Sequence, residues 1–132
     1  MSLKNWDNKT WLSSNSYIKS FNKFLIKEIK LNKNSEILDI GCGRGKILGN
    51  LTSRLRLIKR PIGIDIEQHK DRDKRIIFNK TDAISYLKKN RKKFDLILLK
   101  QTIHFLPLKD IKKLLLLCMN CLNSGGRIAI FT

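Results

Sequence analysis

The stretch that decides the fold is residues 36–45, EILDIGCGRG. Its first half is a short apolar run that contains one acid, Asp39, and such a run is typical of a buried strand. Its second half places glycines at alternate positions, Gly41, Gly43 and Gly45. Glycine permits a sharp turn and lets a ligand approach the backbone where a Cβ would block it. A strand followed by such a turn and then a helix is the context of a ligand-binding glycine turn.

Strands and helices are expected to alternate on both sides of this stretch. Apolar runs predict strands over residues 36–40, 61–65, 75–79, 94–99 and 127–131. Helices are predicted over about residues 14–31, 45–55, 82–90 and 107–122, with Ser13 or Ser14 capping the first and Gly125-Gly126 ending the last. This alternation predicts an α/β fold: a doubly wound, mostly parallel, Rossmann-like sheet of about five strands in the order 3-2-1-4-5, with helices on both faces.

The length and composition fit one domain. The chain has 132 residues with no internal repeat or linker, so we expect a single domain over 1–132, with an N-terminal segment and helix over 1–34 and the core over 35–132. No apolar run reaches the roughly 18 residues of a membrane span, and no apolar signal segment begins the sequence. The Cys118 and Cys121 pair fits core packing better than metal binding. We expect a soluble, cytoplasmic protein with no membrane partner and no metal.

The formal charge of +17, from 28 Lys and Arg against 11 Asp and Glu, suggests a nucleic-acid partner. A second interpretation is codon bias, because the chain has no Val and is rich in Lys, Ile and Asn. The densest basic runs fall in predicted connections that lead back into strands, at residues 30–33, 54–60, 72–75 and 88–93. Such connections lie opposite the ligand edge of a parallel sheet. A polymer bound there would lie away from a ligand, so the placement weakly disfavours nucleic acid as the molecule acted on.

The glycine turn does not fit a dinucleotide. The dinucleotide pattern Gly-x-Gly-x-x-Gly needs a sixth-position glycine, and Lys46 stands there. Asp39 also precedes the turn by two residues, and a carboxylate about 4 Å from a phosphate costs on the order of 1–4 kcal/mol at surface-like dielectrics. A carboxylate at this position suits a cationic ligand instead.

Two further acids follow the next predicted strands. Asp65 ends the second strand, where a carboxylate can accept hydrogen bonds from both hydroxyls of a ribose. Asp82 follows the third strand, where it can meet an amino-bearing base or simply cap the next helix. The carboxyl ends of parallel strands share one edge of the sheet, where doubly wound folds bind ligands. Together with Asp39, these acids fit a nucleoside that carries a positive centre.

At these residues the chain resembles the class I S-adenosylmethionine-dependent methyltransferases, and is most similar to their type 11 group. The resemblance covers about residues 35–131. The matching blocks, in the family's order, are residues 37–45, 63–65, 81–83, 94–104 and 125–130. Family members usually continue with a helix and an antiparallel strand pair, whereas this chain stops at Thr132. The fifth strand is therefore expected to be an exposed edge, and a homodimer through that edge is a possible partner arrangement.

The resemblance implies a binding site for S-adenosyl-L-methionine. Its expected residues are Asp39, Gly41, Cys42, Gly43, Asp65, Ile66, Asp82, Ala83, Leu99 and Lys100. In it Asp39 lies near the ammonium of the methionine, Asp65 binds the ribose, and Asp82 accepts from the adenine amine. Trp11 and Tyr17 are expected to close over the cofactor.

Methyl transfer from a sulfonium is an in-line displacement, so the protein mainly aligns the reactants and excludes water. His104 is the one candidate base in the right segment, and packing or pocket lining is the alternative role. We expect a methyltransferase that acts on a small-molecule acceptor. The alternatives are an RNA or DNA methyltransferase anchored by the basic surface, and a non-catalytic module that binds a cofactor or a partner.

Overall fold

The computed structural model describes residues 14–100, 103 and 106–131. A five-stranded sheet in the order β3-β2-β1-β4-β5 forms the centre of this part of the chain, and every neighbouring pair is parallel. The strands are β1 Ile37–Ile40, β2 Ile62–Asp65, β3 Ile77–Lys80, β4 Phe94–Lys100 and β5 Leu122–Phe131. The predicted fold class and strand order are confirmed.

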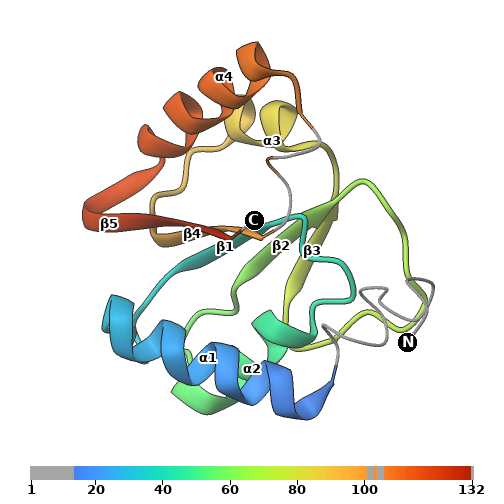
Figure 1. The fold of residues 1–132 in the computed structure, drawn as a ribbon, viewed down its shortest axis with the longest axis vertical. Helices are drawn as coiled ribbons and strands as arrows, with labels where there is room; N and C mark the ends of the chain where they lie inside the picture. Colours follow the sequence, from blue (N-terminus) through green and yellow to red (C-terminus); the bar gives the residue numbers. More distant parts are fainter. Residues whose placement is uncertain (1–13, 101–102, 104–105, 132) are drawn as a thin grey trace.

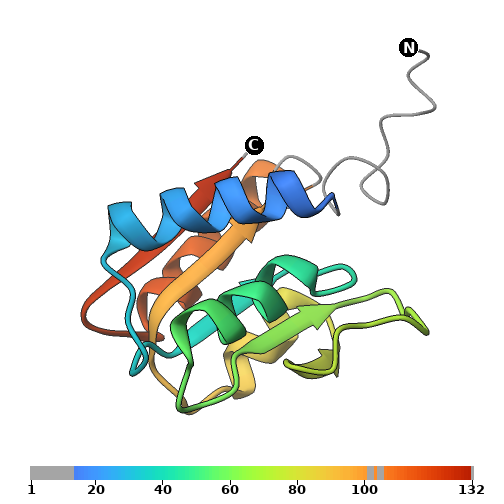
Figure 2. The same cartoon turned by 90° about the horizontal axis from the view of Figure 1, so that it is seen from below.

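Two helices cover each face of the sheet (Figure 1). The helices are α1 Asn15–Ile29, α2 Lys46–Leu55, α3 Ala83–Lys89 and α4 Leu108–Met119. Helices α1 and α2 lie together on one face, as the view from below also shows (Figure 2), and α3 and α4 lie on the other. This arrangement buries β1 completely and leaves β4 buried except for two half-buried residues, Asp95 and Lys100.

The alternation of side chains along the strands divides the core into two clusters. Leu38 and Ile97 pack on the α3/α4 face. Ile37 and Leu96 pack with α1 and α2 on the opposite face. Because successive strand residues point to opposite faces, residues at even steps from Ile37 and Leu96 also project towards α1 and α2. This parity decides which side chains can meet at the site.

Polar caps fix where the helices begin. The Ser14 side chain accepts a hydrogen bond from the backbone N–H of Tyr17 at 3.3 Å, which selects Ser14 as the cap of α1. Asp82 caps α3 by accepting from the N–H of Ser85 at 2.9 Å. Both helices start where the capping pattern predicted, and cap loss typically costs about 1 kcal/mol.

The predicted boundary between the last helix and the last strand is wrong. Helix α4 ends at Met119, and β5 begins at Leu122, ahead of the glycines that were expected to stop the helix. Gly125 and Gly126 lie at a break in the register between β4 and β5. A Cβ on Gly126 would lie 2.8 Å from the carbonyl oxygen of Phe94. The glycine pair therefore admits a bulge inside the strand.

Strand β5 is an edge of the sheet, as predicted. Ile130 in this strand is 44 % exposed. Whether a second copy pairs with the edge stays a prediction. No helix in the described ranges has the length and apolar character that crossing a bilayer requires.

Candidate functional site

The glycine turn between β1 and α2 is held against the end of β2. The N–H groups of Gly41 and Cys42 both donate to the carbonyl of Ile64, at 2.9 and 3.0 Å. Gly41, Gly43 and Gly45 all have a positive φ, at 78°, 56° and 76°, a conformation that glycine adopts without strain.

Two of these glycines meet different surroundings. A Cβ on Gly45 would lie 2.6 Å from the side chain of Ile76, so this position is closed by packing. A Cβ on Gly43 would meet nothing within 4 Å. The backbone at Gly43 therefore faces open space, where a ligand can lie directly against it.

Asp39 lies inside β1 and projects towards α1 and α2. Its neighbours in register are Gly63 on β2 and Leu98 on β4, so the β2 side offers it no side chain. The residue is only 4 % exposed, and its Oδ1 has no hydrogen-bond partner within the described residues. Burial raises the pKa of Asp39 to about 7, against the opposing influence of Lys100. Such a carboxylate gains from a donor or cation that approaches it.

Asp65 connects the glycine turn to the loop after β2. Its Oδ2 accepts the N–H of Gly43 at 2.8 Å, and its Oδ1 accepts the N–H of Glu67 at 3.0 Å. A carboxylate has about four acceptor sites, so two remain for the hydroxyls of a ribose. Ile66 follows immediately and is 67 % exposed, which leaves an apolar surface beside this carboxylate.

Asp82 caps helix α3, which is one of the two roles considered for it from the sequence. One of its oxygens caps α3, and this hydrogen bond to Ser85 lowers the pKa of Asp82. The residue remains exposed two positions beyond the end of β3. Ala83, the first residue of α3, packs against the α3/α4 core cluster. Asp82 is therefore a helix cap placed at the ligand edge.

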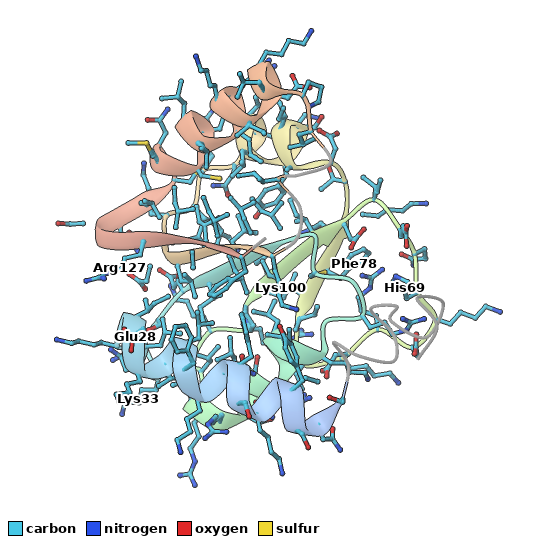
Figure 3. The ribbon with its side chains drawn as sticks, in the orientation of Figure 1. Glu28, Lys33, His69, Phe78, Lys100 and Arg127 are labelled. Atoms are coloured by element: carbon cyan, nitrogen blue, oxygen red, sulfur yellow. The ribbon has the colours of Figure 1, made fainter. Side chains whose placement is uncertain are left out.

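The two residues expected at the end of β4 separate to opposite faces. Leu99 is fully buried in the α3/α4 core cluster, so it offers the crevice only its backbone. Lys100 projects towards α1, where its Nζ lies 4.9 Å from the ring centroid of Tyr17 and 5.4 Å from that of Phe21. Burial lowers the pKa of Lys100 to about 8, while Asp39 opposes the shift. Figure 3 shows Lys100 between the sheet and α1.

Trp11 and His104 lie outside the described residues, so their expected roles stay predictions. Tyr17 does lie on the site's face, and its ring stacks on Phe21 with centroids 5.9 Å apart. The predicted residues that share the α1/α2 face at the ligand edge are thus Asp39, Asp65, Lys100 and Tyr17.

Arg72 lies beside the glycine turn. The prediction that it lies at the edge of the sheet opposite the ligand is wrong. Its guanidinium donates to the carbonyl oxygens of Gly43 and Glu67. It also lies 3.4 Å from the centroid of the Phe78 ring. The loop from β2 to β3 starts at the ligand edge, so its first residues stay there. No pattern in the sequence distinguishes Arg72 from the neighbouring basic residues.

The other basic residues labelled in Figure 3, Lys33 and Arg127, lie at the far end of the sheet. Cys42 lies under Arg72, whose Nη1 is 3.7 Å from the Cys42 Sγ. Burial raises the pKa of Cys42 to about 12, so its thiol stays protonated. Cys42 therefore acts as a compact side chain in the turn. Cys118 and Cys121 are both buried in the α3/α4 core cluster.

The residues present fit S-adenosylmethionine. This cofactor carries cationic groups on its methionine end, a ribose diol and an adenine. The crevice offers a buried Asp39 oxygen that accepts no hydrogen bond from the part of the chain described, a carboxylate with spare acceptor sites at Asp65, and an open backbone at Gly43. A parallel sheet of this order, with an acid inside β1, a glycine turn after it and an acid at the end of β2, is typical of the class I S-adenosylmethionine-dependent methyltransferases.

Residues 37–126 match the family described as "Methyltransferase domain", and the chain belongs to this family. S-adenosylmethionine is the cofactor of the class. A curated relative is an uncharacterized methyltransferase of Schizosaccharomyces pombe, 35 % identical over 60 residues, which are 46 % of this chain and 22 % of that protein.

Solved structures share the fold. An S-adenosylmethionine-dependent methyltransferase from Archaeoglobus fulgidus superposes with a TM-score of 0.68 and 29 % identity, over 84 % of this chain and 51 % of that one. The plantazolicin methyltransferase BamL, solved with a triazolic desmethylPZN analog and SAH, has a TM-score of 0.71 and 23 % identity, over 92 % and 47 % of the two chains. The chain thus spans about half the length of these solved relatives and a smaller share of the curated one.

Proposed function

We propose that this protein transfers a methyl group from S-adenosylmethionine to a small-molecule acceptor. The observation that carries the proposal is the buried Asp39 oxygen, to which none of the described residues donates a hydrogen bond. It lies on the same face as Asp65 and next to an open glycine turn. A cationic nucleoside supplies what this arrangement lacks: a positive group for Asp39 and a diol for Asp65.

The chain's own residues bind and orient the cofactor and exclude water. Asp39 holds the methionine end through charge, and Asp65 fixes the ribose through its remaining acceptor sites. When bound, S-adenosylmethionine supplies an electrophilic methyl group, so an acceptor lone pair bonds to that carbon while the carbon–sulfur electron pair returns to sulfur. Tyr17 and Phe21 lie on α1 next to Lys100 at the ligand edge, where their rings are expected to shield the bound cofactor from water. Alignment of this kind supplies much of the rate without a catalytic base.

The placement of basic residues supports a small acceptor over a nucleic acid. Lys33 and Arg127 lie at the edge of the sheet remote from Lys100 (Figure 3). The run at residues 88–93 ends α3 and leads into β4, and so also belongs to the remote edge. Arg72 is at the ligand edge, but its guanidinium is already engaged by two carbonyl groups. A polymer held by the dense basic runs would keep its bases away from the crevice.

Calorimetry with S-adenosylhomocysteine tests the cofactor half of the proposal. The intact chain should bind this product, and Asp39→Asn should weaken the binding at least tenfold because it removes the charge at nearly unchanged volume. Glu28→Gln is the control, since Glu28 is an exposed acid in the last turn of α1. No binding to the unmodified chain would end the proposal.

Tritium transfer tests the acceptor half. The chain is incubated with methyl-tritiated S-adenosylmethionine and either a low-molecular-mass cell extract or total RNA and DNA. We expect label in small molecules. Label in nucleic acid, together with a binding constant that falls steeply with salt concentration, would establish the alternative acceptor.

A further inference from the structure

The edge of the sheet opposite the ligand is strongly basic. Helices α1, α2 and α3 lead into the strands β1, β2 and β4 at this edge, through the segments 27–36, 54–60 and 88–93. These three segments hold 12 Lys and Arg residues against 2 Glu, which is a net charge of +10. All 12 basic side chains are exposed. We call these 12 residues the basic edge.

The three segments lie side by side. Strands β1, β2 and β4 are parallel neighbours in the sheet, so they start at the same edge. The backbone N–H of Ile58 donates to the carbonyl of Lys33 at 2.9 Å, which joins the first segment to the second. The N–H of Asp95 donates to the carbonyl of Glu36 at 2.8 Å, directly after the third segment. The basic edge is therefore one surface built from three loops.

The charges of the basic edge are poorly neutralised by the protein itself. Among the described residues, Lys59 is the only one of the 12 that forms a salt bridge, with Glu36 at 3.1 Å. Lys113 of α4 lowers the pKa of Lys88 through a hydrogen bond and through its like charge. Like charges held this close repel one another, and a bound anion relieves the repulsion.

A compositional bias towards lysine does not account for this distribution. Such a bias adds positive charge throughout the chain, but it does not remove acids from one edge. Nine of the 11 acids lie outside the three segments. The segregation of charge favours a surface that meets an anionic partner.

We propose that the basic edge binds the phosphate backbone of a double-stranded nucleic acid, which tethers the protein and is not itself methylated. The inference goes beyond the proposed function and does not depend on the identity of the methyl acceptor. A duplex carries one negative charge per about 1.7 Å of its axis, so charges from three adjacent loops meet several phosphates at once. None of the three segments contains an aromatic residue, so the edge lacks the platforms on which unpaired bases stack.

The surface fits a duplex better than a lipid bilayer. Ile58 is the one large apolar side chain that is exposed in these segments, at 67 %. Proteins that lie on a membrane combine positive charge with an inserted apolar face, which a single isoleucine does not supply. Contacts with phosphates need only the charges, and they position a duplex without reading its sequence.

The position of the basic edge also separates the tether from the methyl group. Strand β4 spans residues Phe94–Lys100, which corresponds to about 20 Å between the two edges of the sheet. Figure 3 shows Lys33 on the side of the molecule away from Phe78 and His69. A duplex held at the basic edge therefore lies outside the cofactor crevice.

Fluorescence anisotropy with the intact chain tests the binding. A labelled RNA duplex and a DNA duplex of the same sequence are titrated at several salt concentrations. The logarithm of the binding constant should fall against the logarithm of salt concentration with a slope steeper than about −4.5, which corresponds to five or more phosphate contacts. The duplex that binds more tightly identifies the nucleic acid that the edge serves. No binding of either duplex, or a flat salt response, would overturn the proposal.

Two triple variants of equal net charge locate the surface. One variant removes a charge from each segment of the basic edge, through Lys33→Gln, Arg54→Gln and Lys92→Gln. It should weaken duplex binding at least tenfold and reduce the salt slope by about 3. The control variant removes three exposed lysines outside the basic edge, through Lys70→Gln, Lys80→Gln and Lys109→Gln. It should weaken binding less than threefold, and urea titrations confirm that both variants are folded. Equal losses would show that binding follows the total charge of the chain, which would overturn the proposal.

Three further measurements separate the tether from its alternatives. Saturation with S-adenosylhomocysteine should change the affinity for the duplex less than twofold. Transfer of tritium from S-adenosylmethionine to the duplex would make the duplex an acceptor and contradict the tether. Binding to vesicles of phosphatidylcholine and phosphatidylserine, without binding to a duplex, would assign the basic edge to a membrane instead. Failure of the chain to bind S-adenosylhomocysteine would defeat the proposed function and leave this inference standing.

Discussion

The Asp65 carboxylate accepts the backbone N–H of Gly43 at 2.8 Å and thereby ties the glycine turn to the carboxyl end of β2. The same carboxylate accepts the N–H of Glu67 at 3.0 Å. One side chain therefore fixes two loops that would surround a bound nucleoside, and it keeps acceptor sites for the ribose. A residue with both roles should affect stability and ligand affinity together.

We predict that Asp65→Ala lowers the free energy of unfolding by about 2–4 kcal/mol, because hydrogen bonds to a charged group contribute about 1.5–3 kcal/mol each. It should also weaken S-adenosylhomocysteine binding at least tenfold. The matched control is Asp95→Ala at the far edge, where Asp95 accepts from the N–H of Glu36 at 2.7 Å and from Asn123 at 3.1 Å. That variant should lose comparable stability in urea titrations and keep its affinity. Equal affinity losses in both variants would mean that Asp65 acts only through folding.

Asp39 should make cofactor binding depend on pH. Its pKa is raised by burial to about 7, and the charges that act on it are those of Lys100 and Asp65. The ammonium of the ligand interacts more favourably with the ionised carboxylate, so affinity for S-adenosylhomocysteine should rise about tenfold from pH 6 to pH 8 as Asp39 loses its proton. Calorimetry in buffers of different ionisation enthalpy should show proton release below pH 7. In Asp39→Asn the affinity should be lower and nearly independent of pH.

The same raised pKa affects the stability of the ligand-free chain. The unfolded chain ionises Asp39 near pH 4, while the folded chain keeps the proton until about pH 7. Stability should therefore fall as pH rises from 4 to 7 and level off above that, by on the order of 4 kcal/mol from this group alone. Lys100 acts in the opposite direction at higher pH, because its pKa is lowered to about 8. Urea unfolding of the unmodified chain and Asp39→Asn across this range measures the difference.

The fold was predictable because each strand is marked by a local pattern. The apolar run that contains Asp39 and the continuous run over residues 94–99 place the two central strands. The glycine turn after β1 and the acid that ends β2 locate the ligand edge. Gly125 and Gly126 misled the prediction, because a glycine pair suits a helix stop as well as a bulge. The close approach of Gly126 to the Phe94 carbonyl oxygen, which identifies the bulge, is visible only in the folded structure.

The position of a site residue was predictable where the residue lies in a strand, because strand geometry determines which face its side chain occupies. It was not predictable where the residue lies in a loop. Strand parity places Asp39 and Lys100 on one face and Leu99 on the other, and such parity follows from the strand limits. Arg72 lies in a loop of irregular conformation between β2 and β3, so its contact with Gly43 depends on the path of that loop. A run of basic residues in a sequence does not indicate the path that the loop takes.

Arg72 should matter for cofactor binding, although no role was predicted for it. It bridges Gly43 and Glu67 and covers Cys42, so Arg72→Ala should weaken S-adenosylhomocysteine binding about tenfold and speed alkylation of Cys42. The matched control is Arg60→Ala, because Arg60 donates to the carbonyls of Lys74 and Ile76 at 2.9 and 2.7 Å in the same loop, near its other end.

Mass spectrometry after iodoacetamide treatment reports on Cys42, with Cys118 and Cys121 as buried references. Added S-adenosylhomocysteine should slow the reaction in the unmodified chain. Arg60→Ala should reduce stability without changing affinity or alkylation. Arg72 would have no positioning role if the two arginine variants bound the ligand equally well.

Gly43 and Gly125 allow the cost of backbone strain to be separated from the cost of blocking a ligand. Both have a positive φ, at 56° and 78°, and a Cβ at either would meet nothing within 4 Å. Alanine at either position should therefore destabilise the chain by a similar amount, about 1–2 kcal/mol, from the left-handed conformation alone. Only Gly43 faces the crevice, so only Gly43→Ala places a methyl group where the cofactor must lie. We expect Gly43→Ala to weaken S-adenosylhomocysteine binding at least thirtyfold and Gly125→Ala to leave it within twofold, as measured by calorimetry beside urea titrations of both variants. Similar affinities in the two variants would show that the ligand does not lie against this turn, because the strain they introduce is the same.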